Sequence, residues 1–462
     1  MAVAVDGGFI PRTVGEERYF VATYGCRVNQ ADSAGVAAEL ERGGLVRTKD
    51  AREAHLVVLN TCTVTHRSDA DVRKAVARLR REAPGAKVMI TGCFAQRDPT
   101  AAAELEGVSA VVGNAHKSRL PVLAQEVLEG PRDGPIVVHT EMEAHPPGAL
   151  PVEPVTTVLD RTRPFVKIQD GCDAHCTYCI IPDVRGPARG ADPDKVLDAV
   201  RTLVERGYFE IVVAGIHLGT YAYTRDSGET LQLEGLVRNI LEVPGLGRLR
   251  LSCIEPMAFP LGLIDLAAAE PRLAPHFHLP LQSGSDRILK RMVRPYRAVE
   301  YLALIQRIEA GVPGACLGTD VIVGFPGETE ADFEDTVAFV EASPLHYVHV
   351  FSYSDRTAGS GRGTPSTRLG DKVDPRIIKE RSTRLNAVGK AKWARYLDRQ
   401  RGRTLPGLVL EPNPRDPSRV RVLTDNFCNV DCEAASLAQG QAVEVRVTGR
   451  EGSRLVGAAA SA

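Results

Sequence analysis

Three cysteines close together in one segment could bind a soft metal. The stretch VKIQDGCDAHCTYCIIPDVRG, residues 166–186, holds Cys172, Cys176 and Cys179 in C-x3-C-x2-C spacing. A preceding apolar run predicts a strand, and the Asp-Gly turn after it places the three thiols in one loop. A tetrahedral zinc ion or a cubane iron–sulfur cluster takes four ligands, so three leave one position open, and an open iron can bind substrate. A structural zinc site with His175 or a remote cysteine as fourth ligand is the alternative.

Three further cysteines each stand at the end of an apolar run. The runs YFVATYGC, LVVLNTC and KVMITGC end at Cys26, Cys62 and Cys93 and predict buried strands. Helical patterns follow them over residues 32–42, 68–81 and 100–106. Such strand–helix alternation predicts an open parallel sheet, which gathers ligands beyond the carboxyl ends of its strands. We therefore expect three thiols at one sheet edge, where they could hold a second cluster; the alternative is that each is a small buried apolar residue.

The alternation resumes in the middle of the chain. Strands are predicted over 165–168, 210–214, 248–253, 276–280, 318–323 and 346–353, and helices over 192–205, 231–241, 261–269, 298–310 and 329–341. Six such units predict a partial (β/α)6 barrel of parallel strands. Barrels of this kind carry their chemistry on loops at the carboxyl ends of the strands, and the loop of Cys172 follows the first of them. The proline-rich stretch 141–154 before the barrel is a predicted linker.

Composition limits the class of protein. A chain of 462 residues suggests about three domains at roughly 150 residues each. The N-terminus lacks a basic start followed by an apolar core, and no run of about 18 apolar residues occurs, so we expect a cytoplasmic protein with no membrane partner. Ten cysteines in this length are too few for a disulfide scaffold. No phosphate loop of the G-x4-G-K-[ST] type follows any predicted strand, which argues against a nucleoside triphosphatase.

The C-terminal part combines positive charge with short strands. Residues 356–403 hold 14 Lys and Arg against 4 Asp and Glu, although the whole chain has a net charge of −1. Short alternating runs after residue 404 predict a small β-barrel, which holds 6 Lys and Arg against 7 Asp and Glu. The preceding segment would therefore supply most of any attraction for nucleic-acid phosphates. Cys428 and Cys432 are expected to be buried strand residues, because two ligands do not make a metal site.

The sequence resembles the radical S-adenosylmethionine (SAM) superfamily, and within it the methylthiotransferases. The C-x3-C-x2-C loop matches the superfamily, and Tyr178 matches the aromatic residue that it places beside adenine. The contexts Gly-Cys-Arg-Val-Asn-Gln at 25–30, Asn-Thr-Cys at 60–62 and Gly-Cys-Phe-Ala-Gln at 92–96 match the three cluster cysteines of methylthiotransferases. The resemblance implies that Cys26, Cys62 and Cys93 bind one [4Fe-4S] cluster, and that Cys172, Cys176 and Cys179 bind a second, which chelates SAM.

The resemblance also implies contacts to SAM and to the clusters. Turns at the later strand ends match those that hold SAM, which assigns cofactor-binding roles to Gly215, Gln282, Ser283, Gly284 and Gly324. Each glycine could instead serve a turn that needs a positive φ. The amides of Asn29, Asn60 and Gln96 are expected near cluster sulfurs, or as caps of turns and helices. Cys253 and Cys316 are expected in the core, and no catalytic side chain is identified.

Activity, partners and domain organisation follow from the same resemblance. Reductive cleavage of SAM would give a 5′-deoxyadenosyl radical that takes hydrogen from the substrate, and a second SAM would methylate a sulfur at the N-terminal cluster before its transfer. The domains would be an N-terminal methylthiotransferase domain (17–145), a radical SAM barrel (158–390) and a TRAM-like RNA-binding β-barrel (396–460). The partners would be the anticodon loop of tRNA and an electron-donor protein, and the chain would be a monomer.

The substrate branch is indicated by a few short motifs. Arg27, Val28 and Asn29 resemble the Lys-Val-Asn of the branch that modifies threonylcarbamoyladenosine more closely than the Gln-Met-Asn of the isopentenyladenosine branch. The sequences GIHLG at 215–219 and IEP at 254–256 indicate the same branch. The alternatives are methylthiotransferases for isopentenyladenosine or for a ribosomal-protein aspartate. An alternative of another class is a non-catalytic RNA-binding protein whose clusters sense redox state.

Overall fold

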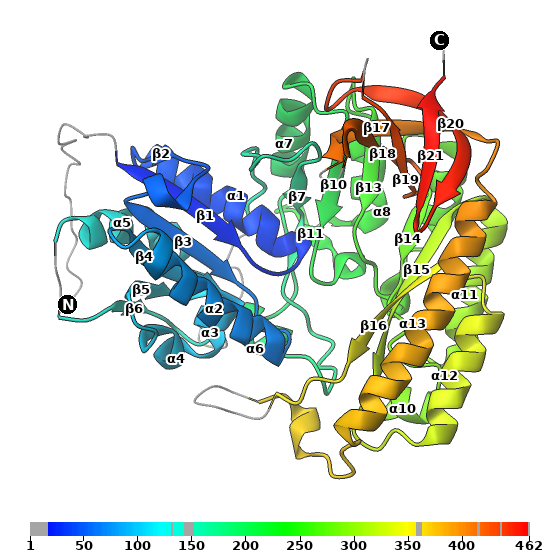
Figure 1. The fold of residues 1–462 in the computed structure, drawn as a ribbon, viewed down its shortest axis with the longest axis horizontal. Coiled ribbons are helices and arrows are strands. Elements are labelled where there is room, and N and C mark those ends of the chain that lie inside the picture. The colour runs from blue at the N-terminus through cyan, green and yellow to red at the C-terminus, as the bar shows by residue number, and fades with distance from the viewer. Residues whose placement is uncertain are drawn as a thin grey trace.

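The computed structural model describes residues 17–130, 133–142, 152–356, 363–413, 416–434 and 437–460. Most of the predicted linker, residues 143–151, lies outside this set, as does the segment 357–362 of the basic region. Three bodies follow one another along the chain: an N-terminal α/β domain, a central half-barrel and a C-terminal β-barrel (Figure 1). In the described parts of the chain no helix has both the length and the apolar character needed to cross a membrane.

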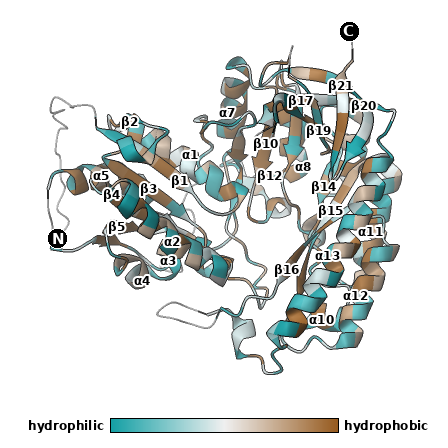
Figure 2. Cartoon of the chain, in the orientation of Figure 1, coloured by the Kyte–Doolittle hydropathy of each residue, from teal (hydrophilic) through white to brown (hydrophobic). Residues whose placement is uncertain are grey.

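The N-terminal domain is an open parallel sheet with helices on both faces, as predicted. Its strand order is β2 (Val46–Arg47), β1 (Arg18–Thr23), β3 (Leu56–Thr61), β4 (Lys87–Gly92), β5 (Val108–Val112) and β6 (Ile136–Val138). The helices are α1 (Arg27–Arg42), α2 (His66–Glu82), α3 (Cys93–Arg97), α4 (Pro99–Ala103) and α5 (Leu120–Leu128). The central strands are buried on both sides, and Figure 2 shows them as largely hydrophobic. Separate apolar clusters fill the space between each face and its helices.

Two details of this domain differ from the sequence prediction. Helix α1 begins at Arg27, five residues before the predicted start, because Cys26 has extended backbone and its carbonyl already accepts the first helical hydrogen bond, from Gln30. Strands β5 and β6 were not predicted. They complete the sheet, but their runs are short and β6 is only partly buried.

The central domain has six strands arranged as a half-barrel, as predicted. Two three-stranded parallel sheets, β13-β10-β7 and β14-β15-β16, meet through a bridge between Leu249 and Leu273. The strands are β7 (Phe165–Lys167), β10 (Glu210–Ala214), β13 (Arg248–Leu251), β14 (His276–His278), β15 (Cys316–Val323) and β16 (Tyr347–Ser352). The outer helices are α7 (Pro193–Glu205), α8 (Leu233–Leu241), α9 (Gly262–Ala269), α10 (Asp286–Arg291), α11 (Ala298–Gly311) and α12 (Glu330–Ala342).

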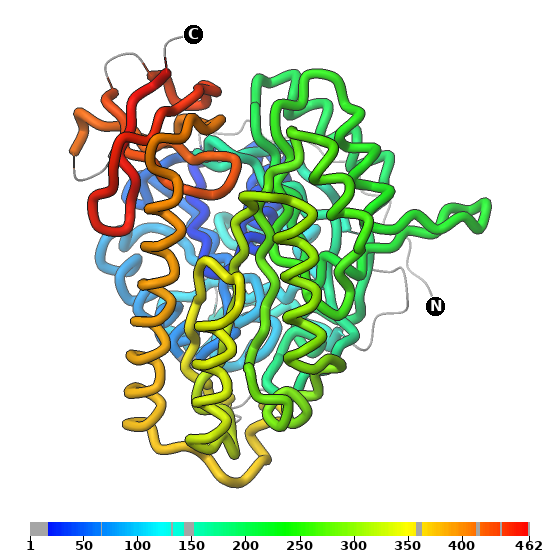
Figure 3. The backbone as a smooth tube through the Cα atoms, turned by 90° about the vertical axis from the view of Figure 1, so that its right-hand side faces the viewer, coloured from blue at the N-terminus to red at the C-terminus, as the bar shows by residue number. Residues whose placement is uncertain are grey.

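Local signals explain where several of these helices begin. The Asp192 side chain caps α7 and precedes Pro193 at the first helical position, while Thr329 and Asp332 form a capping box on α12. Small additions decorate the half-barrel. They are the short helix α6 (Ile181–Arg185), the pair β8 (Gln169–Asp170) and β9 (Arg189–Gly190), and the hairpin β11 (Ala222–Thr224) with β12 (Thr230–Gln232). Figure 3 shows the hairpin projecting from the body of the protein.

The C-terminal part is a long helix followed by a closed β-barrel. Helix α13 (Pro375–Asp398) packs along β16 and continues past residue 390, so it joins the half-barrel to the C-terminal barrel (Figure 1). The barrel strands are β17 (Thr404–Asn413), β18 (Asp416–Thr424), β19 (Asn429–Glu433), β20 (Ala442–Glu451) and β21 (Arg454–Ala459), in the order β17-β18-β19-β21-β20. Closure removes unpaired strand edges, which makes a barrel this small stable.

Candidate active site

The N-terminal sheet places three cysteines beyond the carboxyl ends of adjacent strands. In the parallel register, Thr23 of β1 lies opposite Asn60 of β3, and Thr61 lies opposite Gly92 of β4. Cys26, Cys62 and Cys93 follow these ends within three residues, and we call them the N-terminal triad. Burial, together with the nearby Cys93 and Cys26, raises the pKa of the Cys62 thiol to about 11. The three thiols are therefore close neighbours at one edge of one sheet.

The second set of cysteines, Cys172, Cys176 and Cys179, lies in the loop after β8, and we call it the barrel triad. The sulfurs of Cys172 and Cys179 accept hydrogen bonds from the backbone N–H groups two residues later, at 3.4 and 3.5 Å. The loop is anchored by Thr177, whose N–H donates to the carbonyl of Met292 after α10. Burial raises the pKa of Cys172 to about 11, with Cys176 adding to the effect.

The spacing of the sulfurs separates the two metal alternatives. Four Zn–S bonds in a tetrahedron bring sulfurs to about 3.8 Å from one another. Among the described residues, neither triad has its three sulfurs all within 4.8 Å of one another. His175, the proposed fourth zinc ligand, is exposed. Both triads are thus too wide for a single zinc ion, and fit a larger cluster with an open position.

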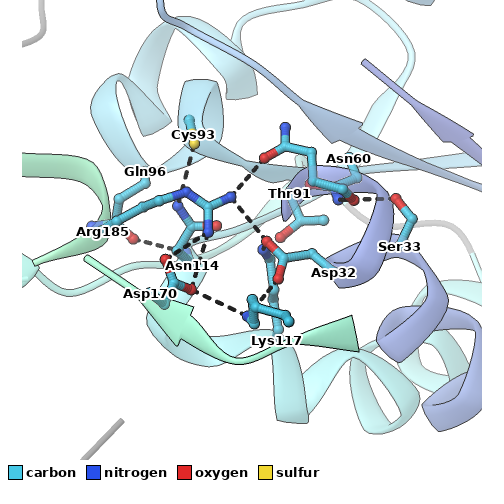
Figure 4. Close-up of polar contacts among 12 residues, drawn as sticks. Asp32, Ser33, Asn60, Thr91, Cys93, Gln96, Asn114, Lys117, Asp170 and Arg185 are labelled. Carbon is cyan, nitrogen blue, oxygen red and sulfur yellow. Dashed lines mark hydrogen bonds and ion pairs between the residues drawn. The ribbon is translucent and has the colours of Figure 1, made fainter. Parts of the chain in front are cut away.

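Buried polar atoms without a hydrogen-bond partner gather around the N-terminal triad. Within the described chain they include Asn60 Oδ1, Thr91 Oγ1, Asn114 Oδ1 and Arg185 Nε. Such atoms are costly in a protein interior, so a polar group is expected beside them. Asn114 also places its amide nitrogen 3.9 Å from Cys93 Sγ (Figure 4). This environment fits a sulfide-containing cluster.

None of the three amides expected to donate to a sulfur does so, and only Asn29 lies beside one, through its oxygen. Asn29 Oδ1 lies 3.9 Å from Cys26 Sγ. The Asn60 amide instead donates to the carbonyl of Asn29 and to Ser33, and the Gln96 amide donates to the carbonyl of Thr140. Asn114 takes the place expected for them. It lies in the 3-10 helix η2 (Asn114–Arg119), outside every motif that the sequence indicated, so no signal pointed to it.

An ion pair borders the barrel triad. Arg294 Nη1 donates to Cys176 Sγ at 3.2 Å, and its other terminal nitrogen is paired with Glu255. Burial alone would lower the pKa of Arg294, but Glu255 raises it well above its ordinary value, so the guanidinium is charged. A cation and a carboxylate side by side complement the carboxylate and amino groups of an amino acid such as the methionine part of SAM. The sequence contained the signal, since Glu255 and Arg294 follow the ends of β13 and α10.

The residues expected to contact SAM all have contacts within the fold. Gly215 lies at the end of β10, where a Cβ atom would approach the Gln169 side chain to 3.0 Å. Ser283 and Gly284 pack against Thr336 of α12, and Gln282 adopts φ +68° while its backbone pairs with β15. Gly324 has φ +77°, and a Cβ atom there would lie 2.3 Å from Ile378 of α13. Tyr178 packs with Ile288, Met292 and Phe325. These contacts explain the residue types without SAM, and the SAM contacts stay predictions.

The inner face of the half-barrel is polar. Phe277, Leu317 and Val321 belong to the core beneath the helices, so the alternating residues His276, His278, Asp320, Tyr347 and His349 point to the opposite, inner face. A filled barrel usually carries bulky apolar residues there. The His349 side chain is 57% exposed, so this inner face is open to a ligand.

Hydrogen bonds join these inner-face residues in a chain. Tyr347 Oη lies 2.9 Å from both His276 Nε2 and His278 Nδ1. Asp320 Oδ1 lies 2.9 Å from His278 Nε2 and 3.1 Å from His349 Nδ1. Burial would raise the pKa of Asp320, but these two histidines hold it below its ordinary value. The Asp320 carboxylate therefore fixes both imidazoles and leaves Nε2 of His349 at the exposed end.

The C-terminal barrel reaches the same inner face. Phe427 stacks on His276 with ring centroids 3.9 Å apart, and Arg250 of β13 donates to the carbonyls of Thr424 and Asp425. Cys428 and Cys432 are buried in the barrel core, as predicted, and so is Cys316. The prediction that Cys253 is a core residue was wrong. It is only partly buried, because it lies just past the end of β13.

Comparisons with known proteins cover both cysteine-bearing domains. The family described as "Uncharacterized protein family UPF0004" matches residues 18–113, and the radical SAM superfamily matches residues 166–340. The threonylcarbamoyladenosine tRNA methylthiotransferase MtaB of Aquifex aeolicus is 36% identical over 413 residues, which are 89% of this chain and 95% of that protein. This chain belongs to the radical SAM tRNA methylthiotransferases.

Relatives of this methylthiotransferase carry two different names. MtaB of Bacillus subtilis is 33% identical over 92% of each chain. The tRNA-2-methylthio-N(6)-dimethylallyladenosine synthase of Agrobacterium fabrum is 34% identical over 93% of this chain and 95% of that protein. The protein is thus an enzyme that transfers a methylthio group, with SAM and two [4Fe-4S] clusters as cofactors, and not a redox sensor without catalysis. The names do not decide which adenosine it modifies.

The fold is also found in a solved radical SAM enzyme. The methyltransferase TsrM of Kitasatospora setae aligns with a TM-score of 0.54 over 76% of this methylthiotransferase and 77% of TsrM, at 17% sequence identity. At this identity the likeness concerns the fold alone. It supports the predicted arrangement of an α/β domain beside a radical SAM half-barrel.

Proposed function

We propose that this methylthiotransferase modifies C2 of N6-threonylcarbamoyladenosine at position 37 of tRNA. The proposal includes the cluster ligands: the N-terminal triad would hold one [4Fe-4S] cluster, and the barrel triad would hold the other, with SAM on its open iron. When bound, the barrel cluster and SAM supply a 5′-deoxyadenosyl radical that removes a hydrogen atom from the substrate. The protein's own residues bind and orient the cofactors and the nucleoside.

The observation that carries the choice of substrate is Arg27 beside a polar inner face. Arg27 follows Cys26 and is only partly buried, and its guanidinium has neither an ion pair nor a hydrogen bond among the described residues. The other cations near the inner face have carboxylate partners, Arg250 with Glu210 and Arg294 with Glu255. Arg27 is therefore the cation there that can bind an anionic ligand.

Electrostatic effects support a position of Arg27 at this inner face. Burial raises the pKa of Tyr347, and the charge of Arg27 acts in the opposite direction; burial lowers the pKa of His276, and Arg27 lowers it further. The threonylcarbamoyl group carries a carboxylate, a hydroxyl and amide groups, which these residues can bind. An isopentenyl group is apolar and offers Arg27 no acceptor, so a charged hydrogen bond worth about 1.5–3 kcal/mol would be lost.

The test uses two transfer RNAs that differ only in the group on adenosine 37. The anaerobically reconstituted enzyme is given SAM, a reductant and tRNA that carries either threonylcarbamoyladenosine or isopentenyladenosine, and nucleosides are identified by mass spectrometry. We expect the methylthio product only from the threonylcarbamoyl tRNA, and none from that tRNA with Cys26→Ala. Methylthio-isopentenyladenosine as the main product would show that the proposed substrate is wrong.

A variant of Arg27 tests the observation itself. Arg27→Gln removes the charge, and we expect the KM for the threonylcarbamoyl tRNA to rise about tenfold or more, as for the loss of one charged hydrogen bond. Arg42→Gln is the matched control, because Arg42 lies at the far end of the same helix, is 69% exposed and forms an ion pair with Glu39. An unchanged KM in Arg27→Gln would exclude Arg27 as the anchor and leave the product test standing.

A further inference from the structure

One buried arginine connects the N-terminal domain to the loop of the barrel triad. Arg185 is the last residue of α6, which begins two residues after Cys179, and its side chain is 2% exposed. Its Nη1 donates to both carboxylate oxygens of Asp170, at 2.9 and 3.0 Å. Its Nη2 donates to Asp32 Oδ2 at 2.9 Å (Figure 4). The same nitrogen donates to Asn29 Oδ1 at 2.6 Å. A single planar guanidinium thus binds both domains at once.

Each end of this connection leads to a cysteine. On the barrel side, Asp170 Oδ1 accepts a hydrogen bond of 2.9 Å from the N–H of Gly171, the residue before Cys172. On the N-terminal side, Asn29 Oδ1 lies 3.9 Å from Cys26 Sγ. Asn29 also donates its amide to the carbonyls of Tyr24 and Thr61, which lie just before the cysteines of that domain. A continuous polar path of three side chains therefore joins the two triads.

Helix α6 makes a second, apolar contact with the N-terminal triad. Ile180 and Val184 pack directly on Cys93. The carbonyl of Val184 accepts a hydrogen bond of 2.7 Å from Asn114, whose amide nitrogen is also 3.9 Å from Cys93 Sγ. Any rotation of α6 that displaces Arg185 would also move the groups that cover Cys93.

The buried charges around Arg185 do not balance. Asp32 pairs with Lys117 at 2.8 Å and with Lys167 at 2.6 Å, in addition to Arg185. Asp170 pairs with Lys167 at 3.1 Å as well as with Arg185 at 2.9 Å, so each carboxylate lies between cations. Three cations, the buried Arg185 and the two mostly buried lysines, thus face two carboxylates, which leaves a positive excess beside the N-terminal triad.

A cluster bound by the N-terminal triad would supply the negative charge that balances this positive excess. Three thiolates on a cluster give it a net negative charge, and adding an electron makes that charge larger. A nearby buried cation stabilises the reduced form more than the oxidised form, because the low dielectric of the interior screens it little. The excess therefore raises the reduction potential of a cluster held by Cys26, Cys62 and Cys93.

We propose that Arg185 is a positioning residue that holds the two cluster-binding loops in register and, through its charge, raises the reduction potential of the N-terminal cluster. The inference rests on the assignment of the two triads to clusters, and it is independent of which adenosine is modified. A purely structural role for Arg185 would predict a different result, because a buried ion pair can often be replaced by apolar residues without loss of stability. Charge and geometry can be separated experimentally, because lysine keeps the charge but has one nitrogen in place of the two that reach Asp170 on one side and Asn29 and Asp32 on the other.

The first experiment measures the potential. In the full chain, the barrel triad is replaced by alanine so that only the N-terminal cluster assembles, and the cluster is titrated by electron paramagnetic resonance. For Arg185→Met we expect, at a fixed potential, about a tenfold lower ratio of reduced to oxidised cluster, equivalent to a shift of about −59 mV for one electron. Arg185→Lys should stay close to the parent protein. Arg201→Met, an exposed change on α7, serves as control.

The second experiment measures coupling in the enzyme with both clusters. The amount of 5′-deoxyadenosine formed for each methylthio product should rise severalfold in Arg185→Met and also in Arg185→Lys, because both lose the register between the loops. A potential and a product ratio equal to those of the parent, at full iron content, would overturn the proposal. If Arg185→Met does not fold, Arg185→Lys decides, since an unchanged product ratio in that variant contradicts the positioning role.

A failure of the proposed function gives a different result. If the enzyme makes no methylthio-threonylcarbamoyladenosine, the potential of the N-terminal cluster can still be measured, and the coupling ratio can be measured with whichever tRNA is modified. Loss of the N-terminal cluster in Cys26→Ala but not in Cys253→Ala would show that the cluster assignment on which the inference rests is correct.

Discussion

Arg294 places a guanidinium nitrogen 3.2 Å from the sulfur of Cys176 while its other terminal nitrogen is paired with Glu255. Its Nε also donates to Tyr296, and the guanidinium lies over the Tyr296 ring at 5.0 Å. The three nitrogens of this planar group thus donate to a cysteine sulfur, a carboxylate and the Tyr296 hydroxyl. This arrangement holds a cation and an anion at the mouth of the barrel triad in a fixed geometry.

Replacing Arg294 should weaken the use of SAM. In Arg294→Lys the charge stays but the shared contacts with Cys176 and Glu255 cannot all be made, so we expect about a tenfold rise in the KM for SAM with clusters still present. Formation of 5′-deoxyadenosine measures the effect, and iron content checks cluster loading. Arg297→Gln is the control, since Arg297 is 70% exposed and pairs with Asp286 at the surface. Equal losses in both variants would contradict a specific role for Arg294.

A methyl group at Gly92 should disturb the N-terminal triad. Gly92 has φ +94°, and a Cβ atom there would lie 2.4 Å from the carbonyl oxygen of Thr61. Gly92→Ala must therefore shift the backbone next to Cys93, which we expect to cost about 1–3 kcal/mol of stability and to lower the iron bound by the N-terminal domain. Thermal unfolding and iron analysis measure both effects.

Gly85 provides the matched glycine control. It lies in the turn before β4, its φ is not in the positive region, and a Cβ atom there would meet nothing within 4 Å. Gly85→Ala should leave both the unfolding temperature and the iron content close to those of the parent. If Gly92→Ala also bound four irons at the N-terminal triad without loss of stability, the close approach of β3 and β4 would not constrain that site.

The strand–helix order could be predicted from the sequence, because the spacing of apolar residues indicated the type of each element and capping or turn residues marked where it begins or ends. Strands such as Leu56–Thr61 are continuous apolar runs, and helices such as Glu330–Ala342 begin at capping residues. The same order predicted that the N-terminal triad meets at one edge. That inference needed only the rule that the carboxyl ends of parallel strands lie at the same edge of a sheet.

The contacts between domains could not be predicted in this way. Arg185 is separated from Asn29 by 156 residues, and Asn114 lies in a 3-10 helix without a motif. The link from Asp320 to His349 also depends on the register of β15 against β16. A single sequence has no local signal for pairs so far apart. The partners of Arg185 and Asn114 depend on how the domains pack together, and that of Asp320 depends on strand register within the central domain.

Acid should weaken the fold through Glu210. Burial would raise the pKa of Glu210, but Arg250, Arg163 and Arg248 lower it to about 2, against an ordinary value of 4.5. A lowered pKa contributes stability that is present above pH 4.5 and is lost as the pH falls from 4.5 towards 2. The shift corresponds to about 3 kcal/mol. The Glu210→Gln variant should therefore be less stable than the parent at pH 7 by roughly this amount.

The pH dependence distinguishes this effect from a general loss of packing. The difference in unfolding free energy between parent and Glu210→Gln should shrink as the pH falls below 4.5, because protonation removes the same charge in the parent. Chemical unfolding of chains prepared without clusters, at several pH values, measures it. Glu229→Gln, an exposed change in the β11–β12 hairpin, should show no difference at any pH. A constant difference across the range would mean that the arginines do not lower the pKa of Glu210.

Charges on α13 should bind tRNA phosphates. Lys379 and Lys390 are exposed, have no ion pair within the described residues and are 11 residues apart, which is about three helical turns, so they share one face. Lys379 also lines a hollow of about 560 Å³ between α13 and β16. The C-terminal barrel has no excess of positive charge. In Lys379→Gln/Lys390→Gln we expect weaker tRNA binding at low salt, with the slope of log K against log salt shallower by about 1.5. The kcat at saturating tRNA should not change, because neither side chain touches the triads.

Arg73→Gln/Lys74→Gln on α2 removes the same net charge from another exposed surface and should keep the parent slope. An equal loss in both double variants would mean that the overall charge of the enzyme, and not this face of α13, attracts the tRNA.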